Sequence, residues 1–450
     1  MSDAKVTQKI VFTGTLQLDS PLVIGSGTET ETRTNEADIH VLKDKQERPF
    51  IPGTSLAGVL RDWFEHLDPV ATKTLFGFVT KNENTMNDVQ SAVSISDVVL
   101  ANSEIIVRDG VSIDVYSGTG IKGAKYDFEA VERGAKGKFL MIVTVREYQE
   151  RLIPDLDTLI RKLADRICSG FSAGALTTKG MGLVSVPDVT VNYYDFRNKN
   201  SVANWLLKKA SNKQYQGKVC AAGSEDTFIA DGEFALKTSL LVRNQNADES
   251  DGDTSINAVP MKSKEAYLIP GTSLKGVLRH HALKILSEIG KPDSLMDELM
   301  GFSTKKASKK SRFSVNEVYF KEGVKEASQT RNRIDRFTGG TIESALFTNR
   351  ALWQGKNGVP VLKIHFEVAD CHDWEAGLAL FLLKDLWTGK IAIGGEKSIG
   401  RGLLTGCSAV VMFKGKRYVI NENGKVSEGD REELERLAAA LVNKKEAAEA

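Results

Sequence analysis

A short segment near the start of the chain alternates between polar and apolar positions. Thr13, Thr15 and Gln17 fall on one side of an extended backbone, and Phe12 and Leu16 fall on the other. This period of two is typical of a strand with one buried face. We therefore expect the chain to open with a β-strand.

A helical pattern follows in the sequence IPGTSLAGVLR, which begins at Ile51. Thr54 or Ser55 is placed to cap the helix, directly after Pro52 and Gly53. The apolar residues then recur with helical spacing, at Leu56, Val59, Leu60, Trp63, Phe64 and Leu67. The same pattern returns after Ile269, so we expect two amphipathic helices.

The later parts of the chain carry apolar runs that predict further elements. FLMIVTV from Phe139 and LKIHFEV from Leu362 have the length and composition of buried strands. Helical patterns follow each of them, near 156–170 and 374–387. A last helix is expected after Gly429, with Asp430 and Glu433 as a capping box and an apolar stripe at Leu434, Leu437 and Leu441.

These elements belong to an internal repeat. IPGTSLAGVLR at 51 and IPGTSLKGVLR at 269 match at ten of eleven positions, at an offset of 218. Four further pairs follow in the same order: LFGF and LMGF (224), SISDV and SVNEV (220), IDVYSGTGIKGAKY and IDRFTGGTIESALF (221), and KGMG and IGRG (220). Collinear matches at nearly one offset indicate a tandem duplication.

The duplication sets the predicted domains and the fold class. We expect one domain over 8–192, a linker over 193–224, a second domain over 225–413, and a charged C-terminal tail with a helix over 414–450. Each domain reads as strand, helix, strands, helix and a glycine-rich return, which is the order of the split βαβ plan. The prediction is therefore α+β, a tandem ferredoxin-like (RRM-like) domain.

Composition and charge narrow the function classes. The chain has 450 residues, with 60 basic and 59 acidic side chains and a net charge of +1, so a nucleic-acid surface would have to be local. No apolar run reaches the length of a membrane span, and the polar start is no signal peptide, which predicts a cytoplasmic protein without a membrane partner. The cysteines form no CxxC pair, so no zinc site is expected.

Two sequence features could contact phosphates. One is a basic run made of Lys305, Lys306, Lys309, Lys310 and the neighbouring Arg312. The other is the pair of closing segments GALTTKGMGLVSV and GGEKSIGRGLLTG, with Gly180 and Gly182 in the first and Gly400 and Gly402 in the second. Residues without a Cβ atom let backbone amides approach a phosphate closely.

The motifs IPGTSLKGVLR, LFG, IDRxTG and GEKSIGRG together resemble those of the RAMP superfamily, specifically the repeated backbone subunits of type III CRISPR effector complexes of the Csm and Cmr kinds. Two such domains in one chain are similar to the fused proteins of type III-D systems. The resemblance implies binding of CRISPR guide RNA and complementary target RNA, assembly with other type III effector subunits, and an inserted β-hairpin thumb in each domain. The thumbs map to about 102–138 and 321–357.

The resemblance also implies guide-RNA contacts at the motif positions: Ser55, Arg61, Ser273, Lys275, Arg279 and the glycines of the closing segments. A hydroxyl and a cation near a helix N-terminus suit phosphate oxygens. Ala57 stands where the second copy has Lys275. In the thumb of the second copy, Arg331 and Arg336 are further expected contacts.

The family's cutting residue is an aspartate before the IPG motif, and Asp38 matches that position. A carboxylate there can hold Mg²⁺ or another divalent cation that helps the ribose 2′-hydroxyl attack the phosphate. In the second copy, the offset of 218 from Asp38 leads to Ile256, which cannot bind metal. The second site is then either dead or displaced, and Asp253 is the nearest displaced candidate.

Two alternatives remain open. A non-catalytic guide-RNA scaffold is favoured by Ile256 and Ala57. A guide-RNA-processing endoribonuclease would use histidine as general acid or base, and His40 is the histidine near a predicted site.

Overall fold

The computed structural model describes residues 5–26, 37–79, 88–114, 119–220, 226–243, 256–303, 307–355 and 359–444. They fall into two compact units, the first spanning Met1–Thr177 and Met181–Ala222 and the second Thr178–Gly180 and Gly223–Ala450. Each unit has its own hydrophobic core. Within the described residues, no helix is long and apolar enough to span a membrane.

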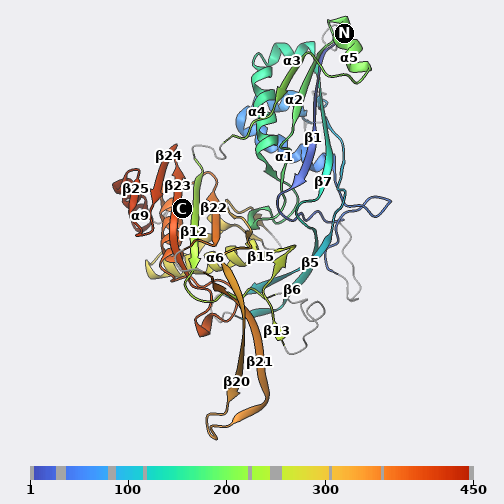
Figure 1. The fold of residues 1–450 in the computed structure, drawn as a ribbon. Helices are drawn as coiled ribbons and strands as arrows, with labels where there is room; N and C mark the ends of the chain where they lie inside the picture. The colour runs from blue at the N-terminus through green and yellow to red at the C-terminus, as the bar shows by residue number, and fades with distance from the viewer. Residues whose placement is uncertain are drawn as a thin grey trace. The chain divides into compact units, whose positions relative to one another are not determined.

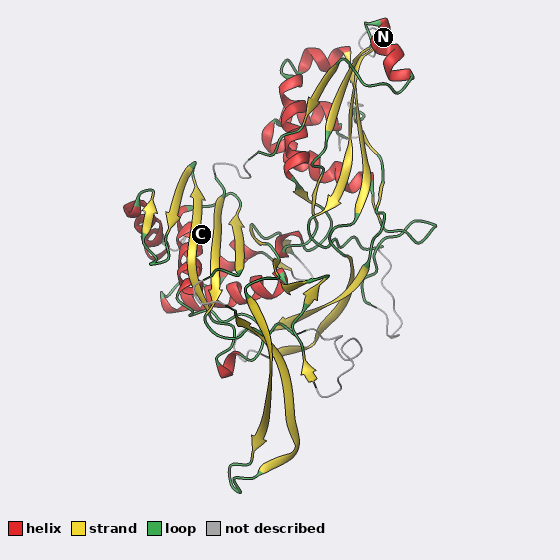
Figure 2. Ribbon diagram, viewed as in Figure 1, coloured by secondary structure: helices red, strands yellow, loops and turns green. Residues whose placement is uncertain are grey.

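The first unit is an antiparallel sheet with helices packed on one face (Figures 1 and 2). The central strands run in the order β10 (Thr190–Asp195), β1 (Val6–Leu18), β7 (Lys136–Arg146) and β3 (Val93–Ile95). The helices are α1 (Gly53–Leu67), α2 (Pro69–Phe76), α3 (Glu147–Leu152), α4 (Leu156–Ser169) and α5 (Lys199–Leu206). The smaller strands are β2 (Phe50–Ile51), β4 (Val98–Val99), β8 (Phe171–Ser172), β9 (Leu183–Ser185) and β11 (Lys213–Gln216).

The second unit repeats this arrangement. Its main sheet runs in the order β18 (Phe313–Val315), β22 (Leu362–Val368), β12 (Phe228–Leu236), β23 (Leu404–Phe413), β24 (Lys416–Ile420) and β25 (Val426–Glu428). The helices are α6 (Gly271–Glu288), α7 (Ser294–Met300), α8 (Asp373–Trp387) and α9 (Arg431–Val442). The short strands are β13 (Ile256–Ala258), β14 (Lys262–Ser263), β15 (Ala266–Ile269), β16 (Phe302–Ser303), β17 (Ser308–Lys309) and β19 (Val318–Phe320).

Each unit also carries a two-stranded hairpin within a segment predicted to be a thumb. In the first unit it pairs β5 (Ile105–Ile113) with β6 (Gly120–Val131). In the second it pairs β20 (Val324–Ile334) with β21 (Thr341–Gln354), and this long hairpin extends well beyond the main sheet of its unit (Figure 1).

The predicted alternation explains why the first strand forms the centre of its sheet. Ile10, Phe12 and Leu16 of β1 are fully buried, whereas Thr15 on the opposite face is exposed. Apolar side chains two residues apart point to the same face of a strand, so they pack together against the helices. The predicted duplicated mixture of helices and strands is confirmed.

The predicted caps of the repeated helix are wrong. α1 and α6 each begin at glycine, after the N-caps Pro52 and Pro270, and no side chain caps either helix. In the first unit, the backbone N–H of Gly53 instead donates to the carboxylate of Asp97 (2.8 Å). Because this partner comes from another part of the chain, Thr54 and Ser55 fall inside the first turn rather than before it.

The segments expected to be a linker and a tail hold ordered elements. Residues 193–224 include α5 and also β11, which pairs with β10. Residues 414–450 include β24, β25 and α9, whose Leu437 and Leu441 are buried. Asp430 caps α9 as predicted, but Glu433 pairs with Lys416 of β24 instead of completing a capping box.

Candidate functional site: the base of the first hairpin

Residues just before the IPG motif lie along the edge of the β5–β6 hairpin. Ile39 forms a parallel bridge with Phe128 of β6. The Oδ2 atom of Asp38 accepts a hydrogen bond from the backbone N–H of Asp127 (2.9 Å), and the N–H of Asp38 donates to the carbonyl of Asp127 (2.9 Å). The Asp38 side chain is exposed. Two hydrogen bonds thus fix the position of a carboxylate that solvent can still reach.

Further carboxylates flank Asp38 on this hairpin. Asp109 and Asp127 face each other in the β5–β6 ladder, with Lys125 Nζ 3.8 Å from Asp109 and 3.7 Å from Asp127. Burial and the neighbouring Asp127 carboxyl raise the pKa of Asp109, against the effect of Lys125. The Oδ1 atom of Asp127 is buried without a hydrogen-bond partner. The pair therefore concentrates negative charge that one lysine only partly balances.

His40 and Glu129 complete this surface. One carboxylate oxygen of Glu129 accepts from the backbone N–H of Val41 (3.0 Å), and the other lies 3.4 Å from His40 Nδ1. The predictions from sequence missed Asp109, Asp127 and Glu129. The available signal was the alternation of Asp127 and Glu129 with the buried Phe128 and Ala130 along one strand.

The described residues contain no group of three or more histidine, cysteine or acidic side chains that could hold a metal ion on its own. A Mg²⁺ ion in a phosphoryl-transfer site commonly uses only one or two protein carboxylates and completes its shell with water and substrate phosphates. Asp38 and Asp127 offer oxygen ligands of that kind. Asp127 Oδ1 accepts no hydrogen bond and has only Lys125 Nζ beside it, at 3.7 Å, so a cation would satisfy it.

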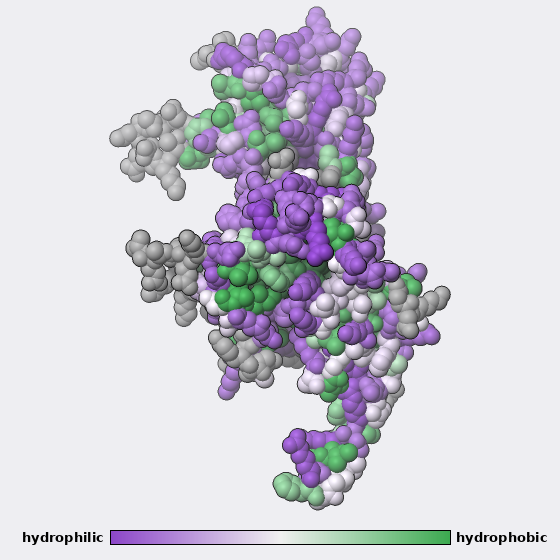
Figure 3. Space-filling view, turned by 90° about the vertical axis from the view of Figure 1, so that its left-hand side faces the viewer, coloured by the Kyte–Doolittle hydropathy of each residue, from purple (hydrophilic) through white to green (hydrophobic). Residues whose placement is uncertain are grey.

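The tip of the second hairpin combines aromatic and cationic side chains. The Asp335 carboxylate accepts from the backbone N–H groups of Phe337 (2.9 Å) and Thr338 (2.8 Å), which shapes the turn. Phe337 is 99% exposed, and Arg336 beside it is exposed too. Hydrophobic and hydrophilic patches lie next to each other at this tip, the lowest part of Figure 3. By contrast, the predicted contact Arg331 is half-buried and pairs with Glu396 (3.4 Å).

The predicted contacts on the repeated helices fall into two groups. Ser55, Arg61 and Ser273 are half-buried, and their side chains have no hydrogen bond or ion pair to any other described residue. Arg279, by contrast, donates to the carbonyl of Gly301 (2.9 Å) and pairs with Asp297 (3.1 Å). The equivalent arginines therefore have different surroundings in the two copies.

Lys275 is only 7% exposed, and its ammonium donates to the hydroxyl of Ser311 (2.8 Å) and the carbonyl of Phe313 (2.8 Å). Burial lowers its pKa to about 7. These contacts fasten α6 to the start of β18. In this conformation the ammonium has a structural role, and a guide contact by Lys275 stays a prediction.

The closing segments adopt matching turns. Gly180, Gly182, Gly400 and Gly402 all have positive φ angles. A Cβ atom on Gly182 would lie 1.9 Å from the carbonyl oxygen of Ala173, and one on Gly402 would lie 1.9 Å from that of Ile393. The second glycine of each segment is therefore required by backbone packing as well as by its φ angle.

The closing segment of the second unit is tied to its hairpin by a buried polar network. Arg401 is 2% exposed, and its guanidinium donates to Glu396 (2.7 Å), Ser239 (2.6 Å) and Gln329 of β20 (2.8 Å). Glu396 also accepts from Asn349 of β21 (2.7 Å). The loop and the hairpin are thus held as one piece.

The predicted basic run is only partly described. Lys305, Lys306 and the predicted second cutting residue Asp253 lie outside the described residues. Lys309 and Lys310 are exposed. Arg312 is held in an ion pair with the buried Glu375 and donates to the carbonyl of Asp370 (2.7 Å), so its charge is neutralised within the fold.

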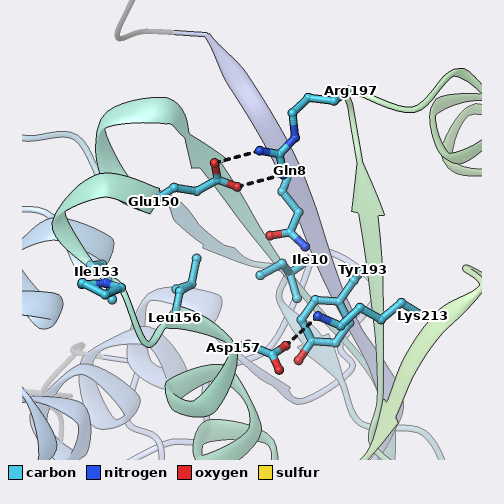
Figure 4. Close-up of a pocket in the computed structure, with 10 residues that line it drawn as sticks. Gln8, Ile10, Glu150, Ile153, Leu156, Asp157, Tyr193, Arg197 and Lys213 are labelled. Carbon is cyan, nitrogen blue, oxygen red and sulfur yellow. Dashed lines mark hydrogen bonds and ion pairs between the residues drawn. The ribbon is translucent and has the colours of Figure 1, made fainter.

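A pocket of about 290 Å³ lies in the first unit between the sheet and the α3–α4 connection (Figure 4). Its charged residues pair across it, Arg197 with Glu150 (3.3 Å) and Lys213 with Asp157 (3.0 Å). None of the residues predicted to bind RNA or metal lines it. These ion pairs connect the turn after β10 to α3, and β11 to α4.

Comparison with known proteins identifies the family. No curated protein matches this chain. The model of the RAMP superfamily matches residues 15–185 and 192–405, two regions that correspond to the two copies of the repeat and together cover most of the sequence. The chain therefore belongs to the RAMP superfamily, with two RAMP domains in tandem.

Proposed function

We propose that this chain is a backbone subunit of a type III CRISPR effector that holds guide RNA and cuts complementary target RNA in a metal-dependent way. Membership of the RAMP superfamily indicates a CRISPR-associated RNA-binding role. The observation that carries the cutting proposal is the exposed Asp38 carboxylate, fixed by the backbone of Asp127 at the base of the first hairpin.

The strand orders support a ferredoxin-like scaffold for both domains. β10-β1-β7-β3 in the first unit and β18-β22-β12-β23 in the second place the first and third strands of each domain together at the centre of its sheet. This is the order expected when a split βαβ unit is duplicated within a domain. The hairpins β5–β6 and β20–β21 are then insertions into that scaffold.

We assign the thumbs to these hairpins. Arg333, Arg336 and Phe337 are exposed near the tip of β20–β21. An exposed aromatic ring can stack on an unpaired base, and guanidinium groups suit the adjacent phosphates. Sequence readout would be left to base pairing between the two RNA strands.

The cutting site would use a divalent cation held by Asp38 with help from Asp127. When bound, Mg²⁺ supplies positive charge that polarises the scissile phosphate and favours ionisation of the ribose 2′-hydroxyl. The N–H of Asp127 keeps the Asp38 carboxylate in place, and Lys125 limits the repulsion between Asp109 and Asp127. Without a cation, this acidic surface would repel an RNA phosphate.

The test is cleavage of a labelled target RNA by the assembled, guide-loaded complex, with Mg²⁺ or with EDTA. Asp38→Asn should remove one product while target binding persists, because the amide oxygen can still accept from Asp127. Asp62→Asn is the matched control, since Asp62 is an exposed carboxylate on α1 whose side chain has no partner among the described residues. If every product survives both Asp38→Asn and EDTA, the proposed cutting role is wrong.

In that case a non-catalytic guide-RNA scaffold becomes the better account. Its support in the sequence is Ile256, at the offset of 218 from Asp38, and Ala57, which stands where the second copy has Lys275. The same complexes distinguish the two functions. If the chain is only a scaffold, a variant that weakens its RNA contacts should lose guide RNA, but the remaining loaded complexes should cut at the same positions.

A further inference from the structure

A short extended segment runs along the base of each hairpin. In the first unit, residues 38–40 run along β6, and in the second unit β13 runs along β21, parallel to it in both cases. Figure 1 shows β13 beside the β20–β21 hairpin. The segment that carries Asp38 therefore has a structural counterpart in β13.

One hydrogen bond sets the residue-by-residue match. Asp38 Oδ2 accepts from the backbone N–H of Asp127 (2.9 Å), and Asn257 Oδ1 accepts from the backbone N–H of Thr348 (2.8 Å). Thr348 follows Asp127 by 221 residues, and Asn257 follows Asp38 by 219, both within the spread of the repeat. Asn257 is exposed, as Asp38 is. Asn257 is thus the counterpart of Asp38.

The residues around Asn257 also carry less negative charge than the residues around Asp38. The facing carboxylates Asp109 and Asp127 are replaced by Thr330 and Thr348, whose hydroxyls hydrogen-bond each other (2.9 Å). The position of Glu129 is taken by Arg350, which lies 3.7 Å from Glu326. The facing carboxylates of the first hairpin are therefore absent from the equivalent positions of the second, and the one arginine there is balanced by Glu326.

We infer that only the first copy carries a cutting site and that Asn257 marks a silent copy, which holds RNA without cleaving it. This inference rests on the proposed function. An amide oxygen preserves the hydrogen bond that shapes the strand edge, but it brings no negative charge to hold Mg²⁺. Arg350, which pairs with Glu326, further disfavours a cation there.

The first experiment is to restore the carboxylates in the second copy. A triple variant, Asn257→Asp with Thr330→Asp and Thr348→Asp, should give one additional product at a new position on a labelled target, besides the Asp38-dependent product. Asn257→Gln, with the neutral threonines kept, is the matched control and should add none. A folded triple variant that binds target and adds no product would overturn the inference.

A second readout separates this inference from the proposed function. Binding of Mn²⁺ to the guide- and target-loaded complex, followed by electron paramagnetic resonance, should lose one site per chain in Asp38→Asn and gain one in the triple variant. If the wild type cuts nothing but these Mn²⁺ changes occur, the proposed function fails and the assignment of Asn257 stands. If a wild-type product or Mn²⁺ site survives Asp38→Asn and is lost in Asp253→Ala, the second copy is active and the inference is wrong.

Discussion

His365 lies on the face of the second sheet opposite the buried Phe366, and its Nδ1 atom is 2.7 Å from Asp231 Oδ1 on the neighbouring strand. Burial alone would lower its pKa, but the hydrogen bond to Asp231 and the nearby carboxylate of Glu367 (3.9 Å) outweigh burial and raise the pKa to about 9. The ordinary value is about 6.5. The imidazolium is therefore held in the folded protein at neutral pH.

The first prediction concerns the pH dependence of this pair. Because the folded pKa is raised, the pair should stabilise the fold fully below pH 6.5 and lose this effect as the pH rises through 9. His365→Gln should lower the free energy of unfolding by on the order of 1 to 2 kcal/mol at pH 6, and by nearly nothing at pH 10. Chemical denaturation at the two pH values measures this. An equal loss at both would show that packing, and not charge, is responsible.

The second prediction concerns Lys275. Lys275→Ala should lower the free energy of unfolding by about 1 to 3 kcal/mol, because Ser311 and the carbonyl of Phe313 lose a buried donor. Lys284→Ala is the control, since Lys284 is exposed on the same helix. Guide retention measured with both variants then tests the predicted RNA contact. If Lys275→Ala releases guide RNA at unchanged stability, the lysine contacts RNA directly.

At the scale of elements, both copies pack the closing segment against the hairpin, but the contact is polar in the second unit and apolar in the first. Where the second unit joins its closing segment to its hairpin through Glu396, Arg401 and Asn349, the first unit places Leu176, Met181 and Phe128. Both versions occupy equivalent positions, at offsets of 220 and 221. Glu396 and Leu176 even share a positive φ angle. The backbone is therefore compatible with either a polar or an apolar joint.

The third prediction follows from this equivalence. Arg401→Met should destabilise the second unit by about 1 to 3 kcal/mol, because the mostly buried Glu396 loses its nearest cation and keeps only Arg331 (3.4 Å) and Arg243 (3.8 Å), and Ser239 loses a buried donor. Adding Glu396→Leu should restore much of that loss, since the double variant copies the apolar pair of the first unit. Thermal unfolding measures both. A double variant no more stable than the single would mean that the joint depends on the polar network itself.

The main elements were predictable because they follow local periodicity. The buried Ile10, Phe12 and Leu16 of the first strand lie on one face, as the alternation indicated. The helix caps were not predictable, because Gly53 finds its partner Asp97 on a distant part of the chain. The same limit applies to Asn257, whose match with Asp38 rests on a hydrogen bond to a hairpin and not on spacing along the sequence.

At the scale of the whole molecule, 60 basic and 59 acidic residues nearly cancel, so RNA affinity depends on which cations are free. Arg279, Arg312 and Arg331 are paired with carboxylates. Several other predicted or exposed cations have no ion pair to any described residue: Arg61, Lys309, Lys310, Arg333 and Arg336. Each of these five side chains can exchange counterions for RNA phosphates.

The fourth prediction is that guide affinity depends on salt through these five cations. Each phosphate contact to single-stranded RNA contributes about 0.7 to the slope of log K against log salt concentration. Arg61→Ala and Arg336→Ala should each reduce that slope by about 0.7, whereas Arg431→Ala should leave it unchanged, because Arg431 already pairs with Glu435. Filter binding of guide RNA at several salt concentrations measures the slopes. An affinity loss that is the same at every salt concentration would mean that the arginine acts by stacking or by shaping the fold, and not by neutralising a phosphate.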